Sequence, residues 1–254
     1  MTTSADRPDV TVVGAGLMGS GIAQVLATAG CRVTLHDVRE SQLTAARHEV
    51  EHGRYGLRAA VARGLLDSAE AEQAFDRLTV TSDLAAACGS VDLVVEAVPE
   101  DLGLKVRVFK ELDRVAPPGA ILTSNSGGLP IAALAEATSR PERVMGWHWA
   151  QPPPVMKLAE LVVHASVSDE TIHTVSELAR ACGKNPIVVR DQPMAWGYVA
   201  NRVHAAARRE AALVVEEGLA SPQDVDALVK DCFRWPLGPF EMLSMAAEQQ
   251  QGRR

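Results

Sequence analysis

Short apolar runs alternate with longer segments of helical period as far as Arg190. Runs rich in β-branched residues are typical of strands buried on both faces, and apolar residues spaced three or four apart are typical of helices. Strands that alternate with helices predict an α/β fold, a Rossmann-type doubly wound sheet that is mostly parallel. The predicted strands are residues 10–13, 32–36, 78–81, 91–98, 120–122, 143–147 and 187–190, and helices are predicted near 101–115, 131–137 and 169–181.

From Pro193 onward the pattern is helical only. We therefore expect two domains, a sheet domain over residues 1–190 and a small all-α domain over residues 191–254. The polar tail at 248–254 is expected to fray. Helices of the second domain are predicted near 195–217 and 222–232, with a last one from about Pro239.

A glycine-rich segment directly follows the first predicted strand and opens a helix. It reads G-x-G-x-x-G, and Asp37 ends the next strand, as the dinucleotide-binding fingerprint requires. The glycines permit a tight turn and a close approach of a pyrophosphate to the helix N-terminus, and Asp37 favours the ribose of NAD over that of NADP, although Arg39 nearby weakens this preference. The alternative is a glycine turn that binds no ligand. The predicted NAD-binding residues of this fingerprint are Gly14, Ala15, Gly16, Leu17, Met18, Gly19 and Asp37.

Composition and charge exclude some classes of function. The chain has a formal net charge of -7 and a sequence pI of about 5.5, whereas a global nucleic-acid footprint needs the opposite balance. No apolar run is long enough to span a membrane, and the polar N-terminus lacks the apolar stretch of a signal peptide. The four cysteines form no C-x-x-C pair, which argues against a zinc site or a disulfide framework and fits a reducing cytoplasm. No metal site is expected.

Polar residues gather where predicted strands end. Glu100, the turn at 124–128 and His148 each follow a strand, and ligands of doubly wound sheets bind beyond the carboxyl ends of the strands. Histidine is the usual general acid or base near neutral pH, and a carboxylate on its second nitrogen would orient it. Glu160 follows His148 after a proline turn, so a strand–turn–strand arrangement could bring the two together. The alternative is a structural histidine.

Six segments stand in one order along nearly the whole chain: V-V-G-A-G-L-M-G-S-G-I-A-Q, V-V-E-A-V-P-E-D-L-G-L-K, T-S-N-S-G-G-L, H-W-A-Q-P-P-P-V-M-K-L-A-E-L-V, G-Y-V-A-N-R and P-L-G-P-F-E. Together they resemble the L-3-hydroxyacyl-CoA dehydrogenase family, whose superfamily includes L-carnitine dehydrogenase, L-gulonate dehydrogenase (lambda-crystallin) and diketoreductase-type enzymes. The resemblance implies that residues 1–190 bind NAD and that the chain is an NAD-dependent oxidoreductase.

The resemblance also implies roles for single positions. His148 would exchange a proton with the substrate oxygen, Glu160 would orient His148, and Asn201 would help to hold that oxygen, unless it is only an amide on a helix surface. Glu100 and Lys105 look like the family's cofactor-contacting pair. The turn and its surroundings would add Asn125 and Gln151 on the cofactor side and Ser126 and Gly127 on the substrate side.

The chain departs from the family pattern at the turn. The family turn reads S-N-T-S-S-L, or S-S-T-S-G-L in the carnitine branch, and its catalytic serine lies 21 residues before the histidine, which here is Gly127. Losing one positioned donor typically costs about 2.7–4 kcal/mol of transition-state stabilisation. Gln151 stands in place of an asparagine. Gly53 and Ala60 replace a serine and a lysine that grip CoA, although Arg54, Arg58 and Arg63 are nearby.

Family members continue past P-L-G-P-F-E with helices that help to build a dimer. The resemblance therefore makes residues 191–254 a truncated C-terminal domain, and it leaves the expected homodimer in doubt.

Two functions from different classes are consistent with these residues. The first is an NAD-dependent enzyme of fatty acid or specialised metabolism that interconverts 3-hydroxyacyl and 3-ketoacyl groups, on CoA, on an acyl carrier protein or as a small 3-hydroxy acid. The second is a catalytically impaired family member that binds NADH and has a structural or binding role. Non-redox chemistry at the same site, such as dehydration, is a third. The sequence does not identify the substrate, its carrier or the direction of the reaction.

Overall fold

The computed structural model describes residues 7–191 and 197–244. It divides into two units, Met1–Tyr198 and Val199–Arg254, and each is described here by itself. The division falls eight residues after the boundary that the sequence predicts at residue 190, because the side chain of Tyr198 is buried in the apolar core of the first unit. The predicted tail at 248–254 lies outside the described residues.

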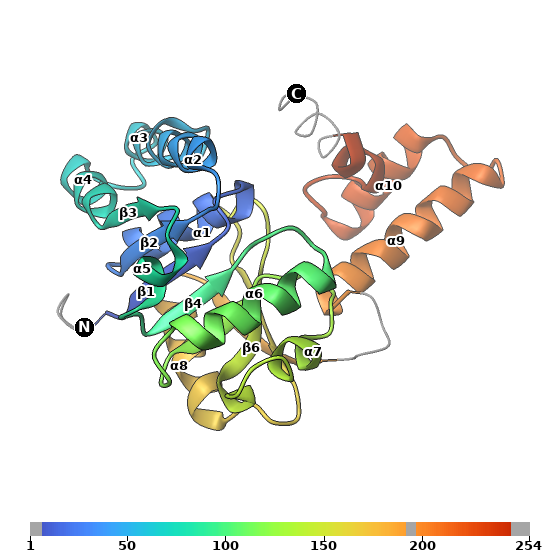
Figure 1. Ribbon diagram of the computed structural model, residues 1–254. Coiled ribbons are helices and arrows are strands. Elements are labelled where there is room, and N and C mark those ends of the chain that lie inside the picture. The colour runs from blue at the N-terminus through green and yellow to red at the C-terminus, as the bar shows by residue number, and fades with distance from the viewer. Residues whose placement is uncertain (1–6, 192–196, 245–254) are drawn as a thin grey trace. The chain divides into compact units, whose positions relative to one another are not determined.

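The first unit is built on an eight-stranded sheet in the order β3-β2-β1-β4-β5-β6-β7-β8 (Figure 1). All neighbouring strands are parallel except β6 and β7, which are antiparallel. The prediction of a doubly wound, mostly parallel sheet is confirmed. The strands are β1 (Asp9–Val13), β2 (Arg32–His36), β3 (Leu78–Thr81), β4 (Leu93–Glu96), β5 (Ile121–Ser124), β6 (Val144–Trp149), β7 (Leu158–Val163) and β8 (Asn185–Arg190).

Helices cover both faces of this sheet (Figure 1). Local capping sets where several of them begin: the Asp101 side chain accepts a hydrogen bond from Leu104 N at the start of α6, and Ser168 does the same for Thr171 N at the start of α8. The sequence does not predict α5, because its alanine run has no apolar period. The helices are α1 (Leu17–Thr28), α2 (Glu40–His52), α3 (Leu57–Ala62), α4 (Ser68–Asp76), α5 (Leu84–Cys88), α6 (Leu102–Val115), α7 (Ile131–Ala135) and α8 (Asp169–Ala181), with a 3-10 turn, η2 (Pro141–Arg143).

Two apolar clusters lie on the two faces of the sheet, one packed under α1 and α8 and the other under α6 and α7. Successive side chains of a strand point to opposite faces, so residues an even number apart share a face. This rule carries four polar side chains to the face of the second cluster, at the strand ends. The residues that share that face are Val94 with Glu96, Leu122 with Ser124, Val144 with His148 and Val162 with Glu160.

The second unit contains α9 (Val199–Glu216) and α10 (Pro222–Phe233), and residues 239–244 are also helical. A capping box between Ser221 and Asp224 begins α10. The buried carboxylate of Asp226 accepts hydrogen bonds from Phe240 N at 2.9 Å and Glu241 N at 3.0 Å, which ties the last helical turn to α10. The prediction of an all-helical second region is confirmed for the described residues.

Candidate functional site

The glycine turn between β1 and α1 has the close packing that its sequence predicts. Gly14 has φ +104°, and a Cβ there would lie 2.7 Å from the carbonyl oxygen of Ala97. A Cβ on Gly19 would lie 1.7 Å from the Gly14 oxygen, whereas nothing lies within 4 Å of a Cβ on Gly16. Side chains are thus excluded where the helix packs on the strand, and space is left where a phosphate group would approach.

The N-terminus of α1 suits an anion. Gly16 caps the helix without a side-chain hydrogen bond, and the first turn carries no acidic residue. The first amides of a helix have no intrahelical partner and carry partial positive charge, so a pyrophosphate fits this end. Asp37 stands beside the turn, with Oδ2 accepting from Ala15 N and Oδ1 from Arg39 N, both at 3.0 Å. The residues present therefore fit a dinucleotide.

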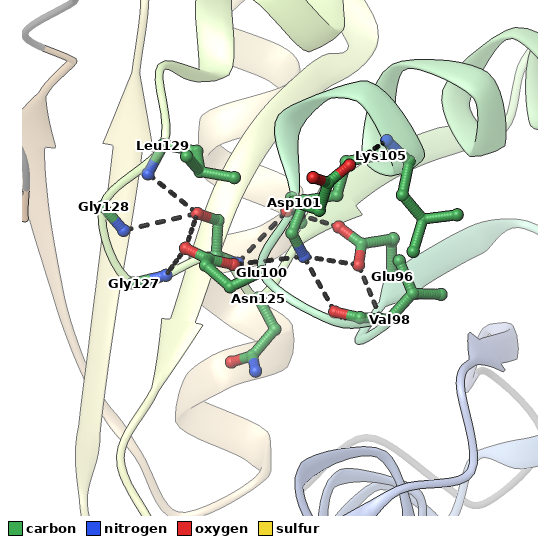
Figure 2. Close-up of polar contacts among 12 residues, drawn as sticks. Glu96, Val98, Glu100, Asp101, Lys105, Asn125, Gly127, Gly128 and Leu129 are labelled. Carbon is green, nitrogen blue, oxygen red and sulfur yellow. Dashed lines mark hydrogen bonds and ion pairs between the residues drawn. The ribbon is translucent and has the colours of Figure 1, made fainter.

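A buried ion pair lies beneath the ends of β4 and β5 (Figure 2). Lys105 Nζ is 2.6 Å from Glu96 Oε1 and donates to the Val98 carbonyl at 3.1 Å, and both charged side chains are almost fully buried. Ser124, the register partner of Glu96, donates to Glu96 Oε2 at 2.6 Å. Lys105 Nζ also lies 3.4 Å from Glu100 Oε2. The ammonium group is directed at carboxylates of the protein.

Burial raises the pKa of Glu96 above its ordinary value. The charge of Lys105 and the hydrogen bonds from Lys105, Ser124 and Val98 all act in the opposite direction. The strand predicted at 91–98 ends at Glu96 in the structure, because Val98 N donates a hydrogen bond to the Glu96 side chain at 2.7 Å. The polar cluster thus shapes the strand end from which Glu100 follows.

Glu100 and Ser126 hold the turn that follows β5. Figure 2 shows Glu100 beside Gly127 of this turn. Glu100 Oε1 accepts from Ser126 Oγ at 2.5 Å and from Gly127 N at 3.0 Å. Ser126 Oγ accepts in turn from Gly128 N at 3.3 Å and from Leu129 N at 2.9 Å. Three successive amides of the turn are therefore bonded to protein side chains. The predicted substrate-side residues Ser126 and Gly127 lie at the centre of this clamp.

His148 and Glu160 are directly opposite one another in the antiparallel pair of β6 and β7. Cross-strand partners point to the same face, and His148 Nδ1 lies 2.7 Å from Glu160 Oε2 with both side chains buried. An ionised carboxylate can only accept a hydrogen bond, so Nδ1 carries the proton and Nε2 is the nitrogen that can exchange one. The strand–turn–strand arrangement considered from the sequence is the one observed.

Tyr198 also belongs to this site, although it is not among the residues that the sequence predicts for it. Its hydroxyl donates to the Leu129 carbonyl at 2.6 Å, and its ring meets the His148 ring edge-on with centroids 5.9 Å apart. Its backbone N and that of Gly197 donate to the carbonyls of Gly127 and Gly128, both at 3.4 Å. The signal in the sequence was its place within G-Y-V-A-N-R, beside the predicted Asn201.

The other predicted residues fall at different places. Asn125 Oδ1 accepts from Trp149 N at 3.0 Å, which joins the turn after β5 to the end of β6. Gln151 is exposed in the turn that follows β6. Asn201 lies in the first turn of α9, in the second unit, so its role stays a prediction.

The described residues contain neither a candidate membrane span nor a candidate metal site. Over 7–191 and 197–244, no helix is both long and apolar enough to cross a membrane. Within the same ranges, no three or more histidine, cysteine, aspartate or glutamate side chains form a group that could hold a metal ion.

Known proteins resemble the chain over both units. The family profile for the NAD binding domain of 3-hydroxyacyl-CoA dehydrogenase matches residues 9–192, and the profile for its C-terminal domain matches residues 197–248. A probable 3-hydroxybutyryl-CoA dehydrogenase of Bacillus subtilis is 38% identical over 233 residues, which are 92% of this chain and 79% of the relative.

Two solved structures extend this result. The crystal structure of FadB2 from M. tuberculosis superposes with a TM-score of 0.85 at 38% identity, covering 92% of this chain and 81% of FadB2. A diketoreductase that acts on dicarbonyl compounds superposes with a TM-score of 0.84 at 32% identity, covering 97% of this chain and 84% of the diketoreductase.

Proposed function

The chain belongs to the 3-hydroxyacyl-CoA dehydrogenase family, an NAD-binding family of oxidoreductases, and on that premise we propose that it interconverts a 3-hydroxyacyl and a 3-ketoacyl thioester. The observation that carries the proposal is the buried contact of 2.7 Å between His148 Nδ1 and Glu160 Oε2 at the carboxyl edge of the sheet. CoA is the first carrier to test, because the printed name of the Bacillus subtilis relative specifies a CoA thioester.

The glycine turn and Asp37 would hold NAD. The free space at Gly16 and the helix N-terminus would receive the pyrophosphate, and the Asp37 carboxylate would accept from a ribose diol. Bound NAD supplies the hydride chemistry. Glu100 would face the cofactor, and Lys105 would act on that site by holding Glu100, since its ammonium already lies against Glu96, Val98 and Glu100.

His148 would move the proton. In oxidation, Nε2 takes the proton of the substrate hydroxyl while Nδ1 stays hydrogen-bonded to Glu160, and in reduction Nε2 returns it to the ketone oxygen. The Glu160 carboxylate fixes the tautomer and stabilises the imidazolium that forms. By the family resemblance, Asn201 would hold the same substrate oxygen.

The turn at Gly127 supports a second candidate function. Gly127 bears no side chain, and the amides of Gly127, Gly128 and Leu129 donate to Glu100 and Ser126. These observations support a family member that binds NADH but turns over slowly, with a structural or binding role. Because His148 Nδ1 and Glu160 Oε2 lie 2.7 Å apart, as the proposed proton transfer requires, we place the enzyme first.

The proposal also covers the substrate's carrier, the oligomeric state and the location in the cell. An acyl-carrier-protein thioester or a small 3-hydroxy acid is the alternative substrate. A homodimer is supported by apolar side chains exposed on α9 and α10, among them Val203 and Phe233. A reducing cytoplasm is supported by the four cysteines, all free thiols and three of them buried.

The test is the rate of NADH consumption with acetoacetyl-CoA, measured beside Gly127→Ser. We expect the parent to turn over and Gly127→Ser to be faster by about a hundred- to a thousandfold, the usual effect of one positioned donor on kcat. Gly119→Ser is the matched control, because a Cβ there has nothing within 4 Å and Gly119 lies outside the site. NADH binding without turnover by either protein, over a panel of CoA and carrier thioesters, would support the second candidate instead.

A further inference from the structure

Tyr198 is the last residue of the first unit, and its side chain is buried within the apolar cluster under α6 and α7. A tyrosine that is only 6% exposed needs a partner for its hydroxyl. That partner is the carbonyl oxygen of Leu129, at 2.6 Å, in the turn whose amides are bonded to Glu100 and Ser126. The phenol therefore fixes the turn from within the core.

The phenol is a lasting hydrogen-bond donor. Burial raises its pKa well above the ordinary value, and the nearby carboxylates of Asp191, Glu100 and Glu160 raise it further, while a hydrogen bond with Ser126 acts in the opposite direction. The hydroxyl thus stays protonated throughout the working range of the protein.

The ring of Tyr198 meets the proposed catalytic histidine. Its centroid lies 5.9 Å from that of the His148 ring at an interplanar angle of 62°, an edge contact that aromatic pairs favour. The hydrogen bond from Nδ1 to Glu160 fixes one atom of the imidazole but leaves the ring able to tilt about that bond. A second contact, from a ring anchored at Leu129, removes this tilt.

We propose that Tyr198 is a positioning residue for His148. Its side chain links the imidazole of His148 to the turn that contains Gly127, a residue without a side chain. The inference rests on the proposed function, because the position of the imidazole matters to turnover only if His148 moves the proton. The hydroxyl sets the position of the phenol ring, and the phenol ring sets the direction of His148 Nε2.

The experiment compares Tyr198→Phe with Tyr198→Leu in the full chain, with NADH and acetoacetyl-CoA as the substrates. Tyr198→Phe keeps the ring and loses one neutral hydrogen bond, so we expect kcat to fall by about two- to tenfold. Tyr198→Leu loses the edge contact, and misplacement of a catalytic group by about 1 Å costs about a hundredfold in rate. The KM for NADH is expected to stay within a factor of two, because the proposed NAD site lies at the glycine turn.

A second readout separates this inference from the proposed function. The imidazole NMR resonances of His148, assigned by His148→Gln, are expected to move in Tyr198→Phe, which keeps an aromatic ring beside His148, whether or not a substrate has been found. Tyr55→Phe is the matched control, because Tyr55 is the other tyrosine of the chain. Unmoved His148 resonances in Tyr198→Phe, or a rise in the KM for NADH at unchanged kcat in either variant, would overturn the proposal. If Tyr198→Leu does not fold, Tyr198→Phe alone decides by the same two readouts.

Discussion

At the residue scale, the chemistry of the site depends on which nitrogen of His148 carries its proton. Glu160 fixes this, since its Oε2 lies 2.7 Å from Nδ1 and can only accept. The sequence could supply both residues and their spacing, because the proline turn between them is visible in it. It could not supply Tyr198, whose contact with His148 joins residues fifty apart along the chain and follows no local pattern.

The prediction at this scale concerns Glu160→Gln. The amide keeps the size of the side chain but can donate to Nδ1, which favours the wrong tautomer, and it no longer stabilises an imidazolium. We expect kcat to fall by about a hundred- to ten-thousandfold, with NADH affinity unchanged, as measured by steady-state kinetics and NADH titration. Glu177→Gln on the exposed side of α8 is the matched control. A variant that keeps kcat within threefold of the parent would remove the pair from the mechanism.

At the element scale, strand register assembles the site. Glu96 and Ser124 are partners across β4 and β5, and His148 and Glu160 are partners across β6 and β7. The strands themselves follow from their β-branched runs, but the register between them is set by packing and was not predicted. The position of Lys105 had a signal in the sequence, because it shares the buried stripe of α6 with Phe109 and Leu112 at helical spacing.

The prediction at this scale is that Lys105→Met destabilises the protein more at high pH than at low pH. Burial raises the pKa of Glu96 in the folded state, so the folded protein binds more protons than the unfolded chain between the ordinary and the raised pKa, and stability falls as pH rises through that window. Removing the Lys105 ammonium, which lowers the pKa of Glu96, widens this pH window. Breaking a buried pair costs about 3–5 kcal/mol, which we expect in full at pH 8 and in part at pH 5.

Urea unfolding of Lys105→Met at the two pH values measures this difference. Lys110→Met makes the same substitution at an exposed position of α6 and is expected to behave like the parent at both. An equal loss at pH 5 and pH 8 would mean that a cavity or lost packing, rather than the charge left on Glu96, destabilises the variant.

At the scale of the whole molecule, the order of strands and helices predicted the α/β architecture. It did not predict the residue at which the two units divide. The change from alternating to helical pattern at Pro193 suggested a boundary at residue 190. The structure divides after Tyr198, whose buried side chain belongs to the same apolar cluster as Phe109 and Val13 in the sheet unit. A buried aromatic beyond the last strand is a tertiary contact, and a helical period cannot report it.

The last prediction is that a fragment of residues 1–198 is more stable than a fragment of residues 1–190. The longer fragment retains the Tyr198 ring, and losing a buried aromatic side chain costs about 3–5 kcal/mol. It also retains Asp191, whose Oδ2 accepts from Ala132 N at 2.8 Å at the start of α7. Urea unfolding measures the difference, and Tyr198→Ala in the longer fragment assigns the share of the ring. We expect that variant to account for most of the gap, whereas equal stability of the two fragments would return the boundary to residue 190.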